Sequence, residues 1–123
     1  MICLDTNYLI NGLTAGTTEA RELVAWIQAG ELLITPMPAW FEFLCGPVTL
    51  VQVTTMRAFL REIIVFDEAQ AREAARLFNA VGRKRSLRVD SMIAGTATLA
   101  GARLATANRA DFAPFVARGL QLV

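Results

Sequence analysis

Short apolar runs recur along the chain and are separated by longer segments with helical features. A run of four apolar residues is typical of a buried strand, because helices in a core are usually longer. Residues 1–4 and 63–66 are entirely apolar, and the similar short segments 32–35, 103–106 and 120–123 are apolar in part. The pattern therefore predicts five strands.

The segments between these runs carry start and stop signals for helices. Threonine, aspartate or proline stands at the start of several segments, and glycine follows the last turn of others. Asp67 is followed three residues later by Gln70, which is the spacing of a capping box. Helices are predicted over residues 5–12, 17–30, 36–46, 49–61, 67–84 and 90–100.

The order of these elements predicts the fold class. Strands that alternate with helices are joined by crossover connections, which give a mainly parallel sheet with helices on both faces. We therefore expect an α/β protein, a three-layer α/β/α sandwich with a mainly parallel five-stranded sheet. The 123 residues have room for one core and show no linker, repeat or low-complexity segment. Residues 1–123 are expected to form a single domain.

The composition adds an expectation about partners. Apolar residues make up 54% of the chain, whereas ~45–50% is usual in globular domains. A chain of this length cannot bury so much apolar surface by itself, so a second subunit or a partner protein should cover part of it. The net charge is only +1, so any attraction to nucleic acid should come from a local basic patch.

Several features of the sequence predict a cytoplasmic protein. No apolar run is long enough to cross a bilayer, and the segment Met-Ile-Cys-Leu-Asp has no basic stretch before an apolar core. We therefore expect no membrane contact and no signal peptide. Cys3 and Cys45 stand in apolar surroundings without metal-ligand spacing, and both are expected to be reduced, buried thiols.

The absence of histidine narrows the possible chemistry. The chain contains none, which excludes catalytic triads built on imidazole, histidine-ligated metals and ribonucleases that use imidazole as acid and base. Any hydrolysis by this protein would have to use carboxylates, a bound metal ion and water.

Four carboxylates stand where a parallel sheet usually forms its site, outside the carboxyl ends of the strands. Asp5 ends the first strand, Glu42 lies on the helix after the second, Asp90 opens the helix before the fourth, and Asp111 follows the fourth together with Asn108. Each has a simpler explanation on its own. Asp5 and Asp90 are good helix caps, and Asp111 suits a cap or turn. Glu42 could lie on the exposed side of an amphipathic helix, although its neighbours are aromatic.

Taken together, these carboxylates predict a metal site. Several like charges at one edge of a sheet are unfavourable unless a cation lies between them. Ligands that are all oxygen suit Mg²⁺, with Mn²⁺ as a substitute. Such a metal polarises a phosphate and activates water without histidine. We therefore expect phosphodiester hydrolysis.

At this point the sequence resembles the PIN domain, and in particular the VapC toxins of bacterial toxin–antitoxin pairs. The matching features are Asp5-Thr6-Asn7 after an apolar strand, Glu42 after the second strand and Asp90 in the pattern Asp-x-x-Ile-Ala. The segment from Thr106 to Phe112 resembles the family's final Thr-x-Asn-x-x-Asp-Phe block. The resemblance covers essentially the whole chain, in the expected order.

The resemblance implies roles for individual residues. Asp5, Glu42 and Asp90 would be the metal ligands, and Thr6 and Asn7 would orient Asp5. Family members often have a fourth acid where this chain has Asn108, which would hold a second metal less firmly. Asp111 is then the remaining candidate for a fourth catalytic carboxylate. Whether one or two metals bind, and whether Asn108 or Asp111 completes the site, remain open.

The resemblance also implies substrates and partners. The protein would be an endoribonuclease that leaves 5′-phosphate and 3′-hydroxyl ends, forms a homodimer and is silenced by an antitoxin whose C-terminal segment lies over the acidic pocket. DNA would be contacted only through the antitoxin. Basic residues that could hold RNA phosphates are Arg83, Lys84, Arg85, Arg88 and Arg109. The first four of these residues could equally stabilise a helix C-terminus.

Two other functions are compatible with the sequence. The chain could be a catalytically weak binding module that supports operator repression by a DNA-binding antitoxin, since it has Asn108 and little net charge. The same carboxylates could also serve a phosphatase or a nuclease that acts on DNA.

Overall fold

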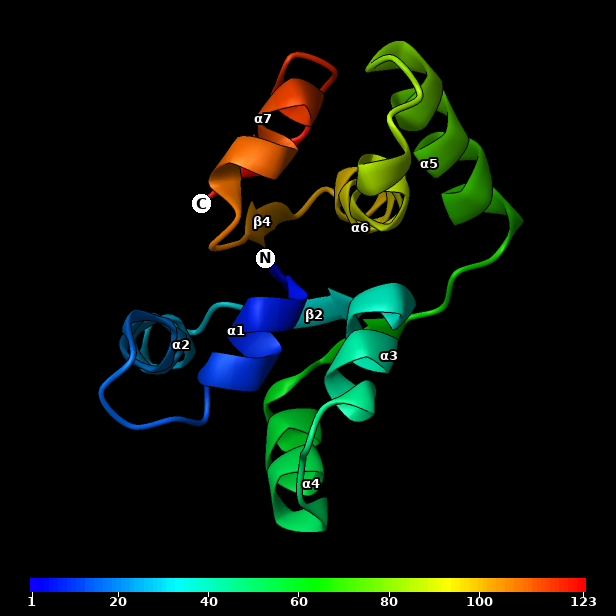
Figure 1. Ribbon diagram of the computed structural model, residues 1–123. Coiled ribbons are helices and arrows are strands. Elements are labelled where there is room, and N and C mark those ends of the chain that lie inside the picture. The colour runs from blue at the N-terminus through cyan, green and yellow to red at the C-terminus, as the bar shows by residue number, and fades with distance from the viewer.

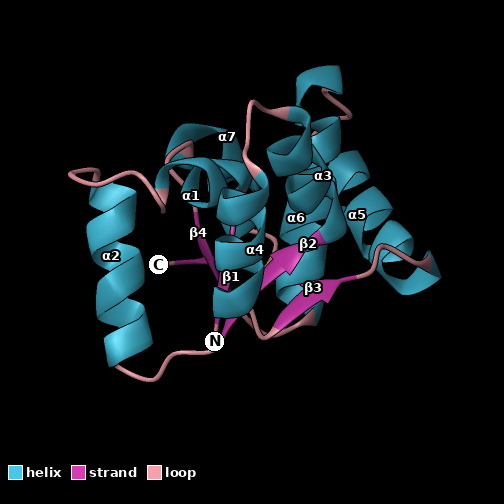
Figure 2. Cartoon of the chain, turned by 90° about the horizontal axis from the view of Figure 1, so that it is seen from below, coloured by secondary structure: helices cyan, strands magenta, loops and turns pink.

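The computed structural model describes residues 1–123 and contains one five-stranded sheet with the strand order β3-β2-β1-β4-β5. Every neighbouring pair of strands is parallel. Figure 2 shows β4, β1, β2 and β3 side by side in that order. The strands are β1 (Ile2–Leu4), β2 (Leu33–Pro36), β3 (Glu62–Ile64), β4 (Arg103–Ala105) and β5 (Gln121–Leu122). The predicted parallel sheet is therefore confirmed.

Helices cover both faces of this sheet. Four of them, α1 (Thr6–Asn11), α2 (Thr18–Gln28), α3 (Met37–Cys45) and α4 (Leu50–Phe59), lie on one side, and α5 (Glu68–Ala80), α6 (Arg88–Leu99) and α7 (Arg109–Val116) lie on the other (Figure 1). This division follows from the right-handed crossovers, because the chain moves outward in one direction from β1 to β3 and in the opposite direction from β4 to β5. The predicted three-layer α/β/α sandwich is confirmed.

Local signals account for most of the helix starts. The Thr17 hydroxyl accepts a hydrogen bond from the Ala20 backbone N–H at the start of α2. The capping boxes of Thr49 with Gln52 and Asp67 with Gln70 are both formed, at α4 and α5. The core lies at the centre of the sheet, where all three residues of β1 are fully buried.

Several predicted boundaries are wrong. The helix that carries Asp90 begins at Arg88 and not at Asp90, and its preceding residue forms no side-chain cap. The helix from residue 67 ends at Ala80 and not near Lys84, because Gly82 and Arg83 both adopt positive φ angles that end a helix. The third strand covers Glu62–Ile64 instead of residues 63–66 and is only partly buried, because it lies at the edge of the sheet.

Two further features differ from expectation. α7 was not predicted, because Pro114 lies inside it and weakens the local helical signal. The helix forms nevertheless, since Phe112 and Phe115 on one of its faces are fully buried. Cys3 is buried as predicted, but Cys45 is exposed at the end of α3, so the prediction of a buried thiol is wrong there. Both thiols are free.

A close contact between α5 and α6 fixes the position of α6. A Cβ atom at Gly95 of α6 would lie 2.8 Å from the backbone nitrogen of Ala74 in α5. Only glycine leaves room for two helix backbones to approach so closely. Because α6 also carries Asp90, this packing sets where that carboxylate lies. None of the helices combines the length and the apolar character that crossing a membrane requires.

Candidate metal centre

A polar pocket of about 280 Å³ lies at the carboxyl edge of the central strands. Asp5 follows β1, Glu42 lies on α3, Asp90 lies in the first turn of α6, and Asn108 follows β4. The structure thus brings together three acids that are up to 85 positions apart, from Asp5 to Asp90. No lysine or arginine lines the pocket, whose lining residues are Asp5, Thr6, Asn7, Ile10, Glu42, Asp90 and Asn108.

Asp5 is the most enclosed acid of the pocket, with 4% of its surface exposed. Its Oδ1 accepts the Thr6 backbone N–H at 2.8 Å, and its Oδ2 accepts the Thr106 hydroxyl at 2.6 Å. Burial raises the pKa of Asp5, and the hydrogen bonds from Thr106 and Thr6 oppose this rise because they favour the carboxylate. The charge of Glu42 raises the pKa of Asp5 further.

Glu42 reaches the same pocket from α3, between the buried residues Trp40 and Phe43. Its Oε1 accepts the Thr6 hydroxyl at 2.8 Å, so Thr6 contacts two of the acids, one through its backbone and one through its side chain. Glu42 is exposed, which agrees with the simpler explanation that it lies on the outer side of an amphipathic helix. Its exposed side chain nevertheless lines the pocket.

Asp90 shows that the pocket concentrates negative charge. Burial and then the charges of Asp5, Asp111 and Glu42 raise the pKa of Asp90 to about 6. Because Asp90 lies inside the first turn of α6 and not before it, the alternative that it is a helix cap is wrong. A carboxyl group held among like charges favours either a proton or a bound cation.

Asn108 and Asp111 are the two candidates for the fourth polar residue of the site. Asn108 lines the pocket, whereas Asp111 is exposed in the first turn of α7 and is not among the lining residues. Asp111 is still close enough for its charge to raise the pKa of Asp90. Asn7 lines the pocket, and its Oδ1 accepts the Ala107 backbone N–H at 3.1 Å, which ties α1 to the loop after β4.

Comparison with known proteins identifies the family of this arrangement. The family model for the PIN domain matches residues 2–114. The chain belongs to the PIN domain family. The resemblance seen in the sequence is therefore confirmed. No curated protein gives a significant match to the sequence.

Several solved structures have a similar fold. A chain of a toxin–antitoxin complex from Klebsiella pneumoniae is 26% identical, with a TM-score of 0.73 over 92% of this chain and 91% of that chain. FitAcB from Neisseria gonorrhoeae is 21% identical, with a TM-score of 0.72 over 100% of this chain and 97% of that chain. VapBC2 from Rickettsia felis, bound to a DNA fragment from their promoter, is 15% identical, with a TM-score of 0.74 over 100% and 98%. The last two similarities concern the fold alone.

The oxygen-rich pocket of this PIN domain fits a hard divalent cation. No three acidic or cysteine side chains lie close enough together to enclose a metal by themselves. Mg²⁺ does not need such a cage, because it usually binds one or two carboxylates and keeps several waters. Carboxylate and amide oxygens from Asp5, Glu42, Asp90 and Asn108 are donors of the right kind, and the raised pKa of Asp90 indicates uncompensated negative charge.

Thr106 lies in the final block of the PIN resemblance, but no role in the site was predicted for it from the sequence. Its hydroxyl contacts Asp5, although the two residues are 101 positions apart. The sequence carried a signal for this contact, because Thr106 directly follows β4 in the same way that Asp5 directly follows β1. The parallel register pairs Leu4 with Ala105, which brings the next residues side by side.

The candidate RNA-binding residues fall into two groups. The Arg83 side chain donates to Asn79 Oδ1 at 2.7 Å and lies over the Phe78 ring, so it is held against the end of α5 as the helix-terminus explanation required. Arg109 donates to the Val123 backbone carbonyl at 2.8 Å. By contrast, Lys84, Arg85 and Arg88 are exposed and make no side-chain hydrogen bond or ion pair.

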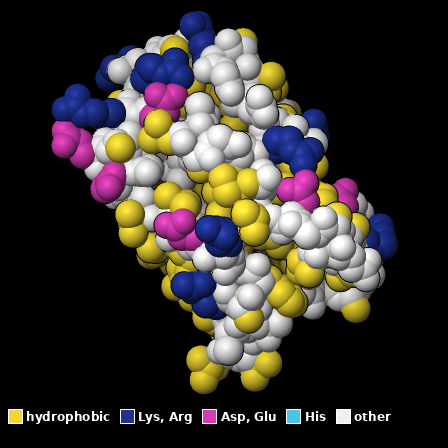
Figure 3. All heavy atoms as spheres, turned by 180° about the vertical axis from the view of Figure 1, so that it is seen from behind, with side chains coloured by type: hydrophobic (Ala, Val, Ile, Leu, Met, Phe, Trp, Pro, Cys, Tyr) yellow, Lys and Arg dark blue, Asp and Glu magenta, His cyan; other side chains and the backbone are white.

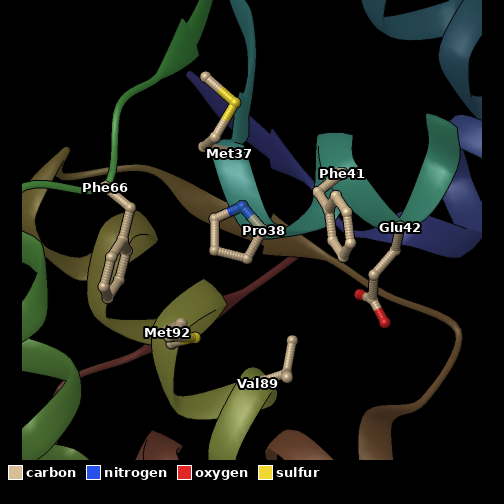
Figure 4. Close-up of a pocket in the computed structure, with 7 residues that line it drawn as sticks. All are labelled: Met37, Pro38, Phe41, Glu42, Phe66, Val89 and Met92. Carbon is tan, nitrogen blue, oxygen red and sulfur yellow. The ribbon is translucent and has the colours of Figure 1, made fainter. Parts of the chain in front are cut away.

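An apolar cavity of about 530 Å³ adjoins the acidic pocket and shares Glu42 with it. Met37, Pro38 and Phe41 of α3 face Val89 and Met92 of α6, and Phe66 closes one side (Figure 4). Phe41 is 65% exposed at its edge. Figure 3 shows one face of this PIN domain from behind, where apolar side chains lie between scattered basic and acidic ones.

Proposed function

We propose that this PIN domain, formed by residues 1–123, is a metal-dependent endoribonuclease, the toxin of a toxin–antitoxin pair. The observation that carries the proposal is the convergence of Asp5, Glu42 and Asp90 in one pocket without a basic side chain. Such a pocket binds a cation and, through it, a phosphate. The match of the PIN domain family model and the similar fold of a chain in a toxin–antitoxin complex from Klebsiella pneumoniae support the biological role.

Asp5, Glu42 and Asp90 would hold Mg²⁺, or Mn²⁺ in its place, with Asn108 as a neutral oxygen donor beside them. When bound, such an ion neutralises charge on the phosphate and lowers the pKa of water. Thr6 keeps the Glu42 carboxylate turned toward Asp5 by its hydroxyl. Glu42 Oε2 is not used in that contact, so it would be available to the cation or to a water molecule beside it. The attacking water would lose a proton and the leaving 3′ oxygen would gain one, neither of them through histidine, because the chain contains none.

The proposal is tested with purified, antitoxin-free protein and a panel of structured RNAs, with Mg²⁺, Mn²⁺ or chelator. Cleavage that requires the metal and leaves 5′-phosphate ends supports it. Single-stranded DNA and a phosphomonoester are assayed in parallel, because faster hydrolysis of either would assign the same carboxylates to a different substrate. No cleavage of any RNA by folded protein contradicts the proposal.

The exposed basic residues give a first prediction about RNA binding. Replacing Lys84, Arg85 and Arg88 together by alanine should weaken RNA binding about 10-fold or more, because each substitution removes a phosphate contact. The slope of log Kd against log salt concentration should fall by about two to three. Fluorescence anisotropy at several salt concentrations measures both effects. Replacing Arg21 and Arg72, which hydrogen-bond within their own helical regions, is the control. An unchanged salt slope in the triple variant would exclude these residues from the RNA contact.

We further propose that the protein forms a homodimer through the apolar cavity. A two-fold interface must be self-complementary, and this face has both an exposed aromatic ring, Phe41, and an apolar cavity beside it. Dimerisation there would place the two acidic pockets near each other, because the cavity shares Glu42 with the pocket.

Phe41→Glu is therefore expected to convert a dimer to a monomer, because a charge would have to be buried at the interface. Light scattering coupled to gel filtration measures the mass. Val51→Glu, at an apolar position of α4 that is 74% exposed, is the control and should leave the mass unchanged. A Phe41→Glu protein of unaltered mass would contradict the proposed interface. Weaker antitoxin binding at unaltered mass would assign the cavity to the antitoxin instead.

The alternative function, a binding module with weak catalysis, is favoured by two observations. Asn108 stands in the pocket where an acid would add charge, and the structure from Rickettsia felis is bound to promoter DNA. In that case the protein would contact DNA only through its antitoxin. It would then support operator repression equally well with Asp5→Asn and Asp90→Asn, while cell growth would be unaffected by either. Under either function, we expect the protein to act in the cytoplasm.

A further inference from the structure

The Thr106 hydroxyl joins two parts of the acidic pocket that come from different ends of the chain. Its Oγ1 donates to Asp5 Oδ2 at 2.6 Å and accepts the Asn108 backbone N–H at 3.0 Å. Thr106 is 4% exposed, so water has little access to this contact. One hydroxyl group therefore connects the acid at the end of β1 with the loop that follows β4.

The direction of these hydrogen bonds is fixed by the number of protons. A threonine hydroxyl has one proton, and the Asn108 N–H uses one of its lone pairs, so the proton is left for Asp5. The other carboxylate oxygen of Asp5 accepts the Thr6 backbone N–H. Both oxygens of Asp5 are thus held by donors, and every buried side-chain polar atom has a partner.

We propose that Thr106 is a positioning residue, which holds the Asp5 carboxylate in the orientation that a divalent cation requires. The inference rests on the proposed metal-dependent function. Without the hydroxyl, Asp5 Oδ2 loses its side-chain donor, so the carboxylate is free to turn away from the cation. Partners that orient a metal ligand in this way typically change metal affinity by 10–100-fold.

The same hydroxyl also places Asn108. Because the Asn108 N–H donates to Thr106, the start of α7 is kept at a fixed position relative to Asp5. Asn108 lines the pocket together with Asp5, Glu42 and Asp90. Loss of the hydroxyl would therefore disturb two oxygen donors together, one charged and one neutral.

The test is Mn²⁺ binding by isothermal titration calorimetry, with no RNA present. Thr106→Val removes the hydroxyl and keeps the shape of the side chain, and we expect a Kd for Mn²⁺ about 10- to 100-fold weaker than that of the wild type. Thr106→Ser keeps the hydroxyl and should restore affinity close to the wild-type value. Circular dichroism in chelator establishes that each variant is folded, and Thr106→Ala serves as a second hydroxyl-free variant if the valine does not fit.

Thr96→Val is the matched control. Thr96 is also fully buried, but its hydroxyl donates to the Met92 carbonyl within α6 and does not touch the pocket. Its variant should bind Mn²⁺ like the wild type. Folded Thr106→Val and Thr106→Ala proteins with wild-type affinity would overturn the inference, as would a Thr106→Ser protein as weak as the valine variant.

The outcomes separate this inference from the proposed function. A wild-type protein that does not bind Mn²⁺ overturns both. A wild-type protein that binds Mn²⁺ equally well with and without the Thr106 hydroxyl overturns the role of Thr106 alone. Thr106→Val should lower the rate of RNA cleavage at limiting Mn²⁺, and excess Mn²⁺ should largely restore the rate. This result would support positioning, because a merely structural defect would not respond to the metal concentration.

Discussion

Asp90→Asn is expected to abolish metal-dependent RNA cleavage and, at the same time, to stabilise the protein in the absence of metal. The amide keeps the shape of the side chain but removes the charge that would face the cation and the phosphate. A loss of about 10³-fold, or about 4 kcal/mol of transition-state stabilisation, is the scale for removing such a group. The metal-free Asp90→Asn protein gains stability because residue 90 no longer adds a negative charge to those of Asp5, Asp111 and Glu42.

The gain in stability should depend on pH. Burial and neighbouring charges raise the pKa of Asp90 from 3.8 to about 6, so the folded state holds this proton more tightly than the unfolded state does. The free energy of unfolding of the metal-free wild type should therefore fall as the pH rises from about 4 through 6. The stability of Asp90→Asn should not fall in this pH range. Above pH 6 this variant should be more stable than the metal-free wild type by about 1–2 kcal/mol, a value reduced for the partial exposure of the site.

Urea unfolding in chelator at several pH values measures the stability, and end-labelled RNA measures the cleavage. Glu62→Gln, a change of an exposed acid on the edge strand β3, is the control for loss of one negative charge. Added Mn²⁺ should stabilise the wild type by about 2.7 kcal/mol at 100 times its Kd, and should stabilise Asp90→Asn much less. An Asp90→Asn protein that still cleaves RNA at the wild-type rate would remove Asp90 from the catalytic site.

Gly95→Ala is expected to destabilise the fold by about 2 kcal/mol, and Gly95→Val by about 3 kcal/mol or more. In an exposed helix, replacing glycine by alanine would instead stabilise by about 1 kcal/mol. Here the new Cβ would lie 2.8 Å from the Ala74 nitrogen and 3.1 Å from the Ala74 Cα. These are backbone atoms of α5, so they cannot move aside as a flexible side chain could, and the two helices must separate.

Thermal and urea unfolding measure this effect, with Gly46→Ala as the matched control. A Cβ at Gly46 would lie 3.5 Å from the Phe43 carbonyl oxygen, an ordinary contact, and its φ of −77° suits alanine. Because α6 carries Asp90, the folded fraction of a Gly95 variant should also bind Mn²⁺ less tightly. A Gly95→Ala protein as stable as the wild type would show that α5 and α6 do not need this close approach.

The local pattern of the sequence was enough to predict the architecture. Short apolar runs, capping boxes and turn glycines depend on residues within a few positions of one another, and they correctly indicated a parallel sheet between two layers of helices. Asp5 was placed at the sheet edge because it ends an apolar run, and the absence of histidine limited the chemistry to carboxylates.

Local patterns failed where burial overrides propensity. α7 contains Pro114 and was missed, because its stability comes from packing Phe112 and Phe115 into the core. Asp90 was expected before its helix because aspartate is a common cap, yet the helix begins two residues earlier, with Asp90 in its first turn. In both cases the signal within the segment was weaker than the contacts made by the folded chain.

Only the tertiary structure decided which polar groups share the pocket. Asn108 and Asp111 are three positions apart and equally plausible in sequence, but one lines the pocket and the other is exposed on α7. Thr106 reaches Asp5 across 101 positions, and this contact depends on the pairing of β1 with β4 in the sheet. The sequence determined that the chemistry must be that of carboxylates at a sheet edge. The fold decided their distances, burial and hydrogen bonds, because these depend on how β1, α3, α6 and β4 pack together.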